Sequence, residues 1–321
     1  MGTATRAGIQ APRTRGAPAA AQSAQSADAR GGWRRRRHGL APYWFLLPYF
    51  IVFAVFWFWP IIDSALLSLQ NTRINPWAWN LGVNWRRLWV DRAFHAALGN
   101  TLTIMAIQVP IMLTLATALA VALNSPLLKL RPIYRFAFFA PVVVSDAAYS
   151  AVFRVLFNGQ FGAVNHAFAA LGLPTVEWLQ DPNAMLSTVM VAMTWRWTGY
   201  NAIILLAGLQ SIPRDLYEAA AIDGATPFDR FFRITLPLLK PILVFCLVLS
   251  VIGTTQLFTE PWLITDRGGP GGGAETLGTY LYKQGFVSMN FGYAAAIAYT
   301  IAGMAAVLAA LNLMLTRQRQ A

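Results

Sequence analysis

Six long apolar runs, separated by short polar segments, account for most of the chain. They cover residues 43–69, 97–124, 136–157, 185–210, 241–262 and 290–315. Each is about 20 residues or longer, the length that a helix rising about 1.5 Å per residue needs to cross a hydrocarbon core of roughly 30 Å. Prolines inside several runs are compatible with spanning helices, because neighbouring helices can satisfy the freed carbonyl groups. The pattern predicts an all-α membrane protein with six transmembrane helices.

Composition supports a membrane location and argues against a nucleic-acid-binding protein. Of 321 residues, 56% are hydrophobic and 12% are charged, whereas soluble proteins have roughly 25% charged residues. The net charge of +12 comes from Lys and Arg in the tails and short loops, where such residues set the orientation in a membrane. The single cysteine, Cys246, lies inside an apolar run, so we expect it to be a small packing residue.

Residues 1–38 differ in composition from the rest of the chain. They are rich in Ala, Gln, Ser, Gly and Arg and hold almost no large apolar side chains, so they cannot bury enough surface to offset the entropy of ordering. The apolar run that follows is too long for the core of a signal peptide and lacks a small-residue cleavage site. We expect a disordered basic cytoplasmic tail over 1–38 and one transmembrane domain over 39–321.

The distribution of Lys and Arg predicts the orientation. With both termini inside, 17 of these residues lie in cytoplasmic segments and 6 in external segments, and the external loop at 158–184 has none. Cytoplasmic loops of membrane proteins carry an excess of basic residues. The sequence therefore predicts a multi-pass protein of the cytoplasmic (inner) membrane with both termini in the cytoplasm.

The cytoplasmic segment 211–240 predicts two short helices joined at a glycine. Gly224 can adopt the left-handed conformation that ends the first helix. Thr226 is a good N-cap, because a proline and then an acidic residue follow it at helix positions that favour them. Pro237 and Pro241 are expected to end the second helix and to begin the fifth span. On physical grounds alone, an amphipathic connector on the bilayer surface fits this segment equally well.

The spacing of residues in this segment resembles a known family. The motif reads EAA at 218–220, G at 224 and ITLP at 234–237, and in full it is similar to the EAA loop of binding-protein-dependent ABC importer permeases. In that family the loop forms coupling helices that dock into clefts on the ATPase subunits. The residues that the resemblance implies for coupling are Glu218, Ala219, Ala220, Asp223, Gly224, Phe228, Ile234, Leu236 and Pro237.

A second segment resembles the carbohydrate permeases of the same family. It carries GGP at 268–270, ETL at 275–277 and YLY at 280–282, with Phe286 after them. This pattern is similar to an external loop of the first of the two paired permeases in maltose, glycerol-phosphate and lactose-type systems. The glycines do not form a phosphate-binding loop, because no Lys-Ser or Lys-Thr follows them.

Four charged residues lie inside the predicted spans at matching depths. Asp146 and Arg196 are near the middle of the membrane, and Arg154 and Glu260 are near its outer surface. An unpaired charge at the bilayer centre costs at least about 2.5–3.5 kcal/mol. We therefore expect the pairs Asp146–Arg196 and Arg154–Glu260 to face the protein interior or a water-filled cavity. A structural role and a functional role both fit such pairs.

Aromatic and amide side chains accompany these charges on the third and fourth spans. Aromatic rings stack on the apolar C–H faces of sugars, while amides and polar ring edges bond hydroxyl groups. Packing within the protein is the alternative explanation for each of them. The candidate substrate pathway consists of Asp146, Tyr149, Trp195, Arg196, Trp197, Tyr200, Asn201, Gln256 and Glu260.

The resemblance implies a non-catalytic permease subunit of an ATP-driven importer, with a carbohydrate as its solute. The implied partners are a second homologous permease, two ATPase subunits, an extracytoplasmic solute-binding protein and membrane lipid, with no nucleic acid. No cofactor or metal is expected on this chain, since ATP and Mg²⁺ belong to the ATPase subunits. Three alternatives stay open: a permease of the same superfamily for a non-sugar solute, an ion-coupled secondary transporter, and a membrane-embedded enzyme, for which no convincing His/Cys/carboxylate cluster is present.

Overall fold

A computed structural model describes residue 2 and residues 41–74, 77–125 and 127–317. The chain divides into two compact units, Met1–Asp63 and Ser64–Ala321. The predicted cytoplasmic tail at 1–38 lies, apart from residue 2, outside the described residues.

A continuous helix begins in the first unit and contains a π turn. It consists of α2 (Ala41–Phe53), the π turn η1 (Ala54–Phe58) and α3 (Trp59–Ser68). The π turn ends two residues before Pro60, and the N–H of Trp59 donates to the carbonyl of Ala54. A π turn holds an extra residue, so it can accommodate a proline, which has no N–H to donate. The segment Tyr43–Ser68 is long and apolar enough to cross a membrane, as predicted.

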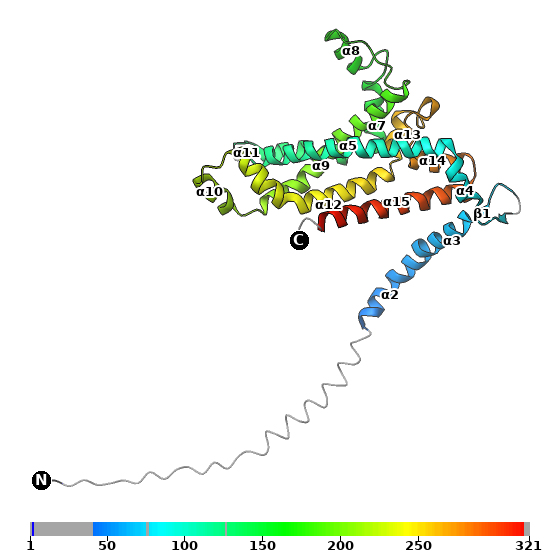
Figure 1. Cartoon of the computed structure of the whole chain (residues 1–321), viewed down its shortest axis with the longest axis horizontal. Helices are drawn as coiled ribbons and strands as arrows, with labels where there is room; N and C mark the ends of the chain where they lie inside the picture. Colours follow the sequence, from blue (N-terminus) through cyan, green and yellow to red (C-terminus); the bar gives the residue numbers. More distant parts are fainter. Residues whose placement is uncertain (1, 3–40, 75–76, 126, 318–321) are drawn as a thin grey trace. The chain divides into compact units, whose positions relative to one another are not determined.

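The second unit is built around four long helices that run side by side (Figure 1): α5 (Arg92–Asn124), α9 (Pro182–Gln210), α12 (Leu236–Thr255) and α15 (Phe291–Arg317). On the predicted cytoplasmic side it adds α10 (Arg214–Ile222), α11 (Pro227–Arg230) and the π turn η2 (Phe231–Thr235). The other elements are the antiparallel pair β1 (Gln70–Asn71) and β2 (Ala78–Trp79), α4 (Val83–Val90), α6 (Arg131–Val143), α7 (Asp146–Leu156), α8 (Ala163–Ala170), α13 (Thr259–Ile264), the 3₁₀ turn η3 (Pro270–Gly272), α14 (Leu277–Tyr282) and the π turn η4 (Lys283–Val287).

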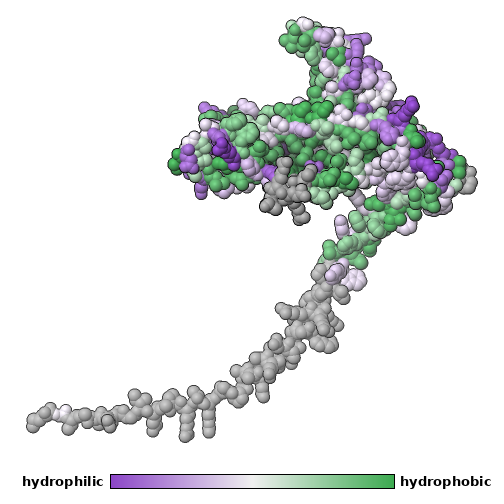
Figure 2. All heavy atoms as spheres, in the orientation of Figure 1, coloured by the Kyte–Doolittle hydropathy of each residue, from purple (hydrophilic) through white to green (hydrophobic). Residues whose placement is uncertain are grey.

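The surface of this bundle has the polarity of a membrane protein. Figure 2 shows hydrophobic residues along the sides of the long helices and hydrophilic residues gathered at the two ends, near α10 and near α4. Such a band is expected where helix surfaces face lipid, because charged side chains are expensive in the hydrocarbon region.

The predicted spans agree with most of the helices. Within the described residues, four helical segments are long and apolar enough to cross a membrane: Tyr43–Ser68, Arg92–Asn124, Pro227–Thr255 and Phe291–Asn312. The helices α6 and α7 supply a fifth crossing if the two count as one span. The predicted fourth span corresponds to α9, which is 29 residues long but less apolar than those four segments. The arrangement is consistent with six spans.

The prediction of one continuous helix at 136–157 is wrong. The chain bends by 95° between α6 and α7. Val144 and Ser145 are extended at this break, and the Ser145 hydroxyl accepts a hydrogen bond from the backbone N–H of Ala148. A serine that caps a new helix competes with continuation of the preceding one. Asp146 is thereby placed in the first turn of α7.

Two predictions about the fifth span are also wrong. Pro237 does not end the second short helix, because α11, η2 and α12 form one continuous helix, Pro227–Thr255. The N–H of Leu236 donates to the carbonyl of Phe231, five residues back, so a π turn again precedes a proline. The span ends at Thr255 and not at 262, because the chain leaves the helix at 256–258 before α13 begins.

The core of the second unit lies between α5, α9 and α12. Small residues from two of these helices, Ala116, Ala120 and Ala202, are fully buried. Small side chains let helix backbones approach closely, which is how membrane helices pack without a hydrophobic driving force. Cys246 of α12 is buried in the same cluster, as expected for a packing residue.

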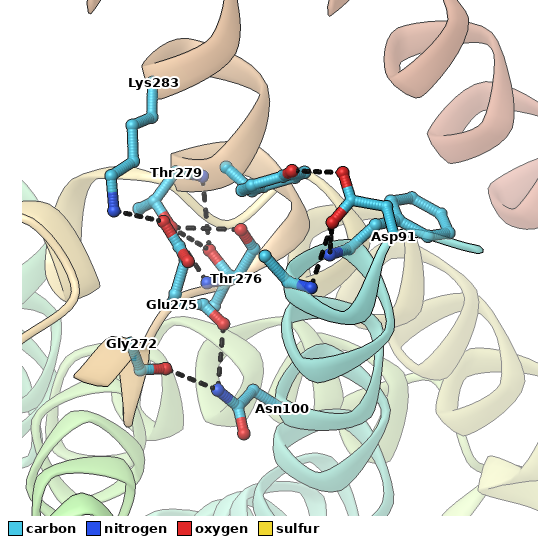
Figure 3. Close-up of polar contacts among 10 residues, drawn as sticks. Asp91, Asn100, Gly272, Glu275, Thr276, Thr279 and Lys283 are labelled. Carbon is cyan, nitrogen blue, oxygen red and sulfur yellow. Dashed lines mark hydrogen bonds and ion pairs between the residues drawn. The ribbon is translucent and has the colours of Figure 1, made fainter. Parts of the chain in front are cut away.

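A polar network fixes the glycine-rich segment after α13 against α5 (Figure 3). The amide of Asn100 donates to the carbonyls of Gly272 and Glu275, at 3.2 and 3.0 Å. Lys283 lies 3.1 Å from the Glu275 carboxylate, and Thr276 caps α14. The segment that resembles the external loop of carbohydrate permeases is therefore held in one conformation by hydrogen bonds.

Asp91 ties the start of α5 to α14 and α15. Its carboxylate caps α5 and accepts hydrogen bonds from the hydroxyls of Tyr280, at 2.6 Å, and Tyr293, at 2.8 Å. Burial raises the pKa of Asp91, but these hydroxyls and the backbone N–H groups of Phe94 and Ala93 outweigh that effect, so the pKa of Asp91 is lowered overall.

Candidate functional site

A cavity of about 360 Å³ lies among α5, α7, α9, α12 and the segment that leads into α13. Seven of the nine residues predicted for the substrate pathway line it: Asp146, Arg196, Trp197, Tyr200, Asn201, Gln256 and Glu260. These residues come from three helices and one connecting segment, so the tertiary structure brings together groups that lie up to 114 positions apart in the sequence.

The predicted ion pair in the membrane interior is present. Arg196 and Asp146 form a salt bridge between α9 and α7, with 9% and 48% of their side chains exposed. The Arg196 guanidinium also lies over the ring of Tyr149, 4.5 Å from its centroid. The bend between α6 and α7 makes this pair possible, because it places Asp146 at a helix start beside α9.

Tyr149 and Trp195 lie outside the cavity lining. Tyr149 is buried behind Arg196, and the Trp195 ring stacks on it with a centroid separation of 6.4 Å. Trp195 is half exposed and lines an apolar groove between α5 and α9. Successive residues on an α-helix point about 100° apart, so Trp195 and Trp197 cannot both face the cavity.

The predicted pair Arg154–Glu260 is wrong. In the part of the chain that the structure describes, these two residues form no ion pair. Glu260 is buried and lines the central cavity, whereas Arg154 lines a separate pocket together with Glu177 and Asp266. The reason is the early end of α12, because Glu260 lies on α13 and not on the outer turn of a straight span.

Four polar residues of the cavity were not predicted from the sequence: Gln108 on α5, Ser250 and Thr254 on α12, and Thr259 on α13. Gln108 is 2% exposed, and its Nε2 has no hydrogen-bond partner among the residues that the structure describes. The Nε of Arg196 is likewise buried without a partner. A buried polar atom without a partner is unusual, and it indicates a place where a ligand or water completes the hydrogen bonds. The amide near the middle of the apolar run 97–124 was the available signal for Gln108.

The segment with the EAA motif has the local geometry that its sequence predicts. Asp223 follows the last turn of α10, and Gly224 has a φ of 77°. The N–H of Ala225 donates to the carbonyl of Ala220 at 2.9 Å, which closes the helix end. Thr226 and the acidic residue three positions later form the predicted capping box at the start of α11.

Residues of this segment differ in exposure. Glu218, Ala219, Asp223, Phe228 and Pro237 are exposed, whereas Ala220, Ile234 and Leu236 are half-buried. The ring of Phe228 is 71% exposed and lies 4.4 Å, centroid to centroid, from the exposed ring of Phe232. Exposed aromatic rings that contact each other are typical of a surface that binds another protein.

Comparison with known proteins identifies the family. The model of the family described as "Binding-protein-dependent transport system inner membrane component" matches residues 129–320. The lactose transport system permease protein LacF of Rhizobium radiobacter is 40% identical over 290 residues, covering 89% of this chain and 97% of that protein. The arabinooligosaccharides transport system permease protein AraP of Bacillus subtilis is 34% identical, covering 91% of this chain and 94% of the relative.

The fold also agrees with a solved structure. A chain in the crystal structure of a bacterial ABC transporter involved in the import of the acidic polysaccharide alginate superposes with a TM-score of 0.78 at 24% identity, covering 89% of this chain and 98% of that chain. The matched family model covers more than half of this chain, from the loop before α6 to the C-terminal end. The chain therefore belongs to the family of inner-membrane components of binding-protein-dependent transport systems.

Proposed function

We propose that this chain is the permease subunit through which an uncharged carbohydrate enters the cell in an ATP-driven importer. The polar cavity carries the proposal. Gln108 and Arg196 each have a buried nitrogen atom without a partner in the described part of the chain, and Ser250 and Thr254 add hydroxyl groups. A sugar supplies both acceptors and donors for such groups, and the rings of Trp197 and Tyr200 offer faces for its C–H groups.

The charges of the cavity favour a neutral solute. Arg196 is the cation among the described lining residues, and Asp146 already neutralises it. A carboxylate or sulfonate on the solute would lie near Glu260 with no free cation to receive it, and a buried charge without a partner is strongly disfavoured. The relatives named for lactose and arabinooligosaccharides support a sugar as the solute.

The exposed EAA segment supports the presence of further subunits in the transporter. In the proposal, Glu218 and Phe228 contact an ATPase subunit, and two such subunits bind ATP and Mg²⁺. A second homologous permease completes the pathway, and an extracytoplasmic binding protein delivers the solute. A neighbouring structure of the alginate transporter contains a "pentasaccharide-bound periplasmic protein", which supports the last of these partners.

The proposed orientation places both termini in the cytoplasm. The excess of Lys and Arg near α10 and in the tail supports it, as does the absence of these residues from 158–184. In this arrangement residues 1–38 form a cytoplasmic tail, residues 39–321 form the transmembrane domain, and the sides of the bundle contact lipid.

The test is a charge reversal at the proposed docking surface. Glu218→Lys replaces attraction to a basic partner with repulsion, which costs several kcal/mol at an interface, on the order of a hundredfold in affinity. The variant should insert normally but lose co-purification of the ATPase subunits. Glu177→Lys, a reversal on the opposite side, is the matched control and should retain them. Retention of the ATPases by Glu218→Lys would contradict the proposed docking. Stimulation of ATP hydrolysis by non-sugar solutes alone would contradict the proposed substrate class.

A further inference from the structure

One chain of hydrogen bonds joins α10 to the base of α12. The hydroxyl of Tyr217 lies 2.9 Å from Oγ1 of Thr235. Thr235 is buried, and its Oγ1 donates to the backbone carbonyl of Arg230 at 3.3 Å. A threonine hydroxyl has one proton, so Tyr217 is the donor in the first bond. Tyr217 thus holds α10, the helix with the EAA motif, to the π turn that begins the long helix.

The lower part of α12 also packs against α9. A Cβ added to Gly208 of α9 would overlap the Cδ1 atom of Ile242 and lie 3.0 Å from Cδ1 of Leu239. Leu239 is fully buried in the core cluster. Close packing at this level makes α12 tilt about Leu239 and Ile242 more readily than it can separate from α9.

Thr235, just before α12, and Ser250, near the other end of α12, lie on opposite sides of the contact that Leu239 and Ile242 make with α9. At about 1.5 Å per helical residue, Thr235 lies roughly 6–10 Å below it and Ser250 roughly 12–16 Å above it. Ser250 and Thr254 line the cavity. A tilt that displaces Thr235 therefore displaces the cavity wall in the opposite direction, and by a larger distance.

We infer that the Tyr217–Thr235 hydrogen bond is the connection through which movement of α10 reshapes the cavity. The inference rests on the proposed docking of α10 against an ATPase subunit. Tyr217 and Thr235 are positioning residues, since neither lines the cavity. Without the bond, α10 still docks, but its movement no longer tilts α12.

The experiment measures the cavity wall directly in the assembled transporter. The chain has a single cysteine, so Cys246→Ala gives a background in which Ser250→Cys reports on the cavity. The rate at which a small methanethiosulfonate reagent modifies this position is compared without nucleotide and with ATP, Mg²⁺ and vanadate. The readout requires no knowledge of the solute.

With Tyr217 and Thr235 unchanged, the modification rate of the introduced cysteine should change at least about fivefold on nucleotide binding. This is the effect that one hydrogen bond has on an equilibrium. Tyr217→Phe and Thr235→Val should each reduce the change to less than about twofold while the ATPases still co-purify. Thr235→Ser keeps the hydroxyl and should preserve the response. Tyr134→Phe, at an exposed tyrosine of α6, is the matched control. The double variant of Tyr217 and Thr235 should be no worse than either single variant.

The outcomes separate the inference from the proposed function. A full nucleotide response in Tyr217→Phe and Thr235→Val would overturn the inference alone. Loss of the ATPases in Tyr217→Phe would also overturn it, because the hydroxyl would then act in docking. If the transporter with Tyr217 and Thr235 unchanged neither retained the ATPases nor showed a change of modification rate with nucleotide, both the inference and the proposed import function would be overturned.

Discussion

A substitution of Gly199 tests the packing that positions the cavity. Gly199 is buried in α9 and faces α6. A Cβ added there would fall on the carbonyl oxygen of Phe138 and lie 2.6 Å from its carbonyl carbon. These are backbone atoms, so they cannot rotate away as the end of a side chain can. In Gly199→Ala, α6 must therefore move away from α9.

The expected cost follows from two opposing effects. Replacing a mid-helix glycine by alanine favours folding by about 0.5–1 kcal/mol through the unfolded chain. Overpacking at a rigid contact costs about 1–3 kcal/mol, so Gly199→Ala should destabilise the protein by up to about 2.5 kcal/mol. Gly303→Ala is the control, because a Cβ there has no neighbour within 4 Å. It should stabilise the protein by about 0.5–1 kcal/mol.

The assay is equilibrium unfolding of the purified chain in mixed micelles of lipid and SDS, followed by tryptophan fluorescence. Gly208→Ala adds a graded comparison, since its Cβ would meet the ends of two side chains, which can adjust. We expect Gly199→Ala to be the least stable of the three variants. If Gly199→Ala were as stable as Gly303→Ala, the close contact between α6 and α9 would be refuted.

Three further predictions address the ion pair, the external network and the orientation. Arg196→Ala and Asp146→Ala should each impair transport, and the double variant should cost less than the sum of the two, whereas additivity within about 0.5 kcal/mol would show that the residues do not interact. The pKa of Asp91 is lowered in the folded protein, so its stabilising effect should be complete above its unfolded pKa of about 4 and should fade as pH falls through the folded pKa. Asp91→Asn should remove this part of the pH dependence of thermal unfolding. An unchanged pH profile in that variant would contradict the prediction. Cysteines introduced into 158–184 should react with impermeant reagents applied to intact cells, and a cysteine at Arg230 should not; the reverse pattern would overturn the proposed orientation.

The helix caps in the segment 211–240 could be predicted from the sequence, although the end of its second helix could not. Gly224 adopts the left-handed conformation and Thr226 forms its capping box, as expected. Helix caps depend on residues within a few positions of each other, so local sequence determines them. The same holds for the long helices, whose apolar length follows from composition alone.

Local reasoning failed where the chain turns inside a predicted span. The breaks at Val144 and Ser145 and after Thr255 interrupt apolar runs that look continuous in the sequence. Counting residues along a straight helix placed Glu260 near Arg154, but α12 ends early and Glu260 lies in the central cavity. A broken helix is stable only where neighbouring helices satisfy its freed backbone groups, and single-chain patterns do not reveal those neighbours.

The sequence by itself determined that this chain crosses a membrane, which residues bear charge within the apolar runs, and where the helix caps of the segment 211–240 lie. Only the tertiary structure decided which side chains share the cavity: it selected Trp197 and not Trp195, and added Gln108. The rotational position of α9 is set by the contact of Gly199 with Phe138 and by the pairing of Arg196 with α7. These contacts join residues more than 45 positions apart, and helical periodicity carries no information about the direction in which a helix faces until its neighbours pack against it.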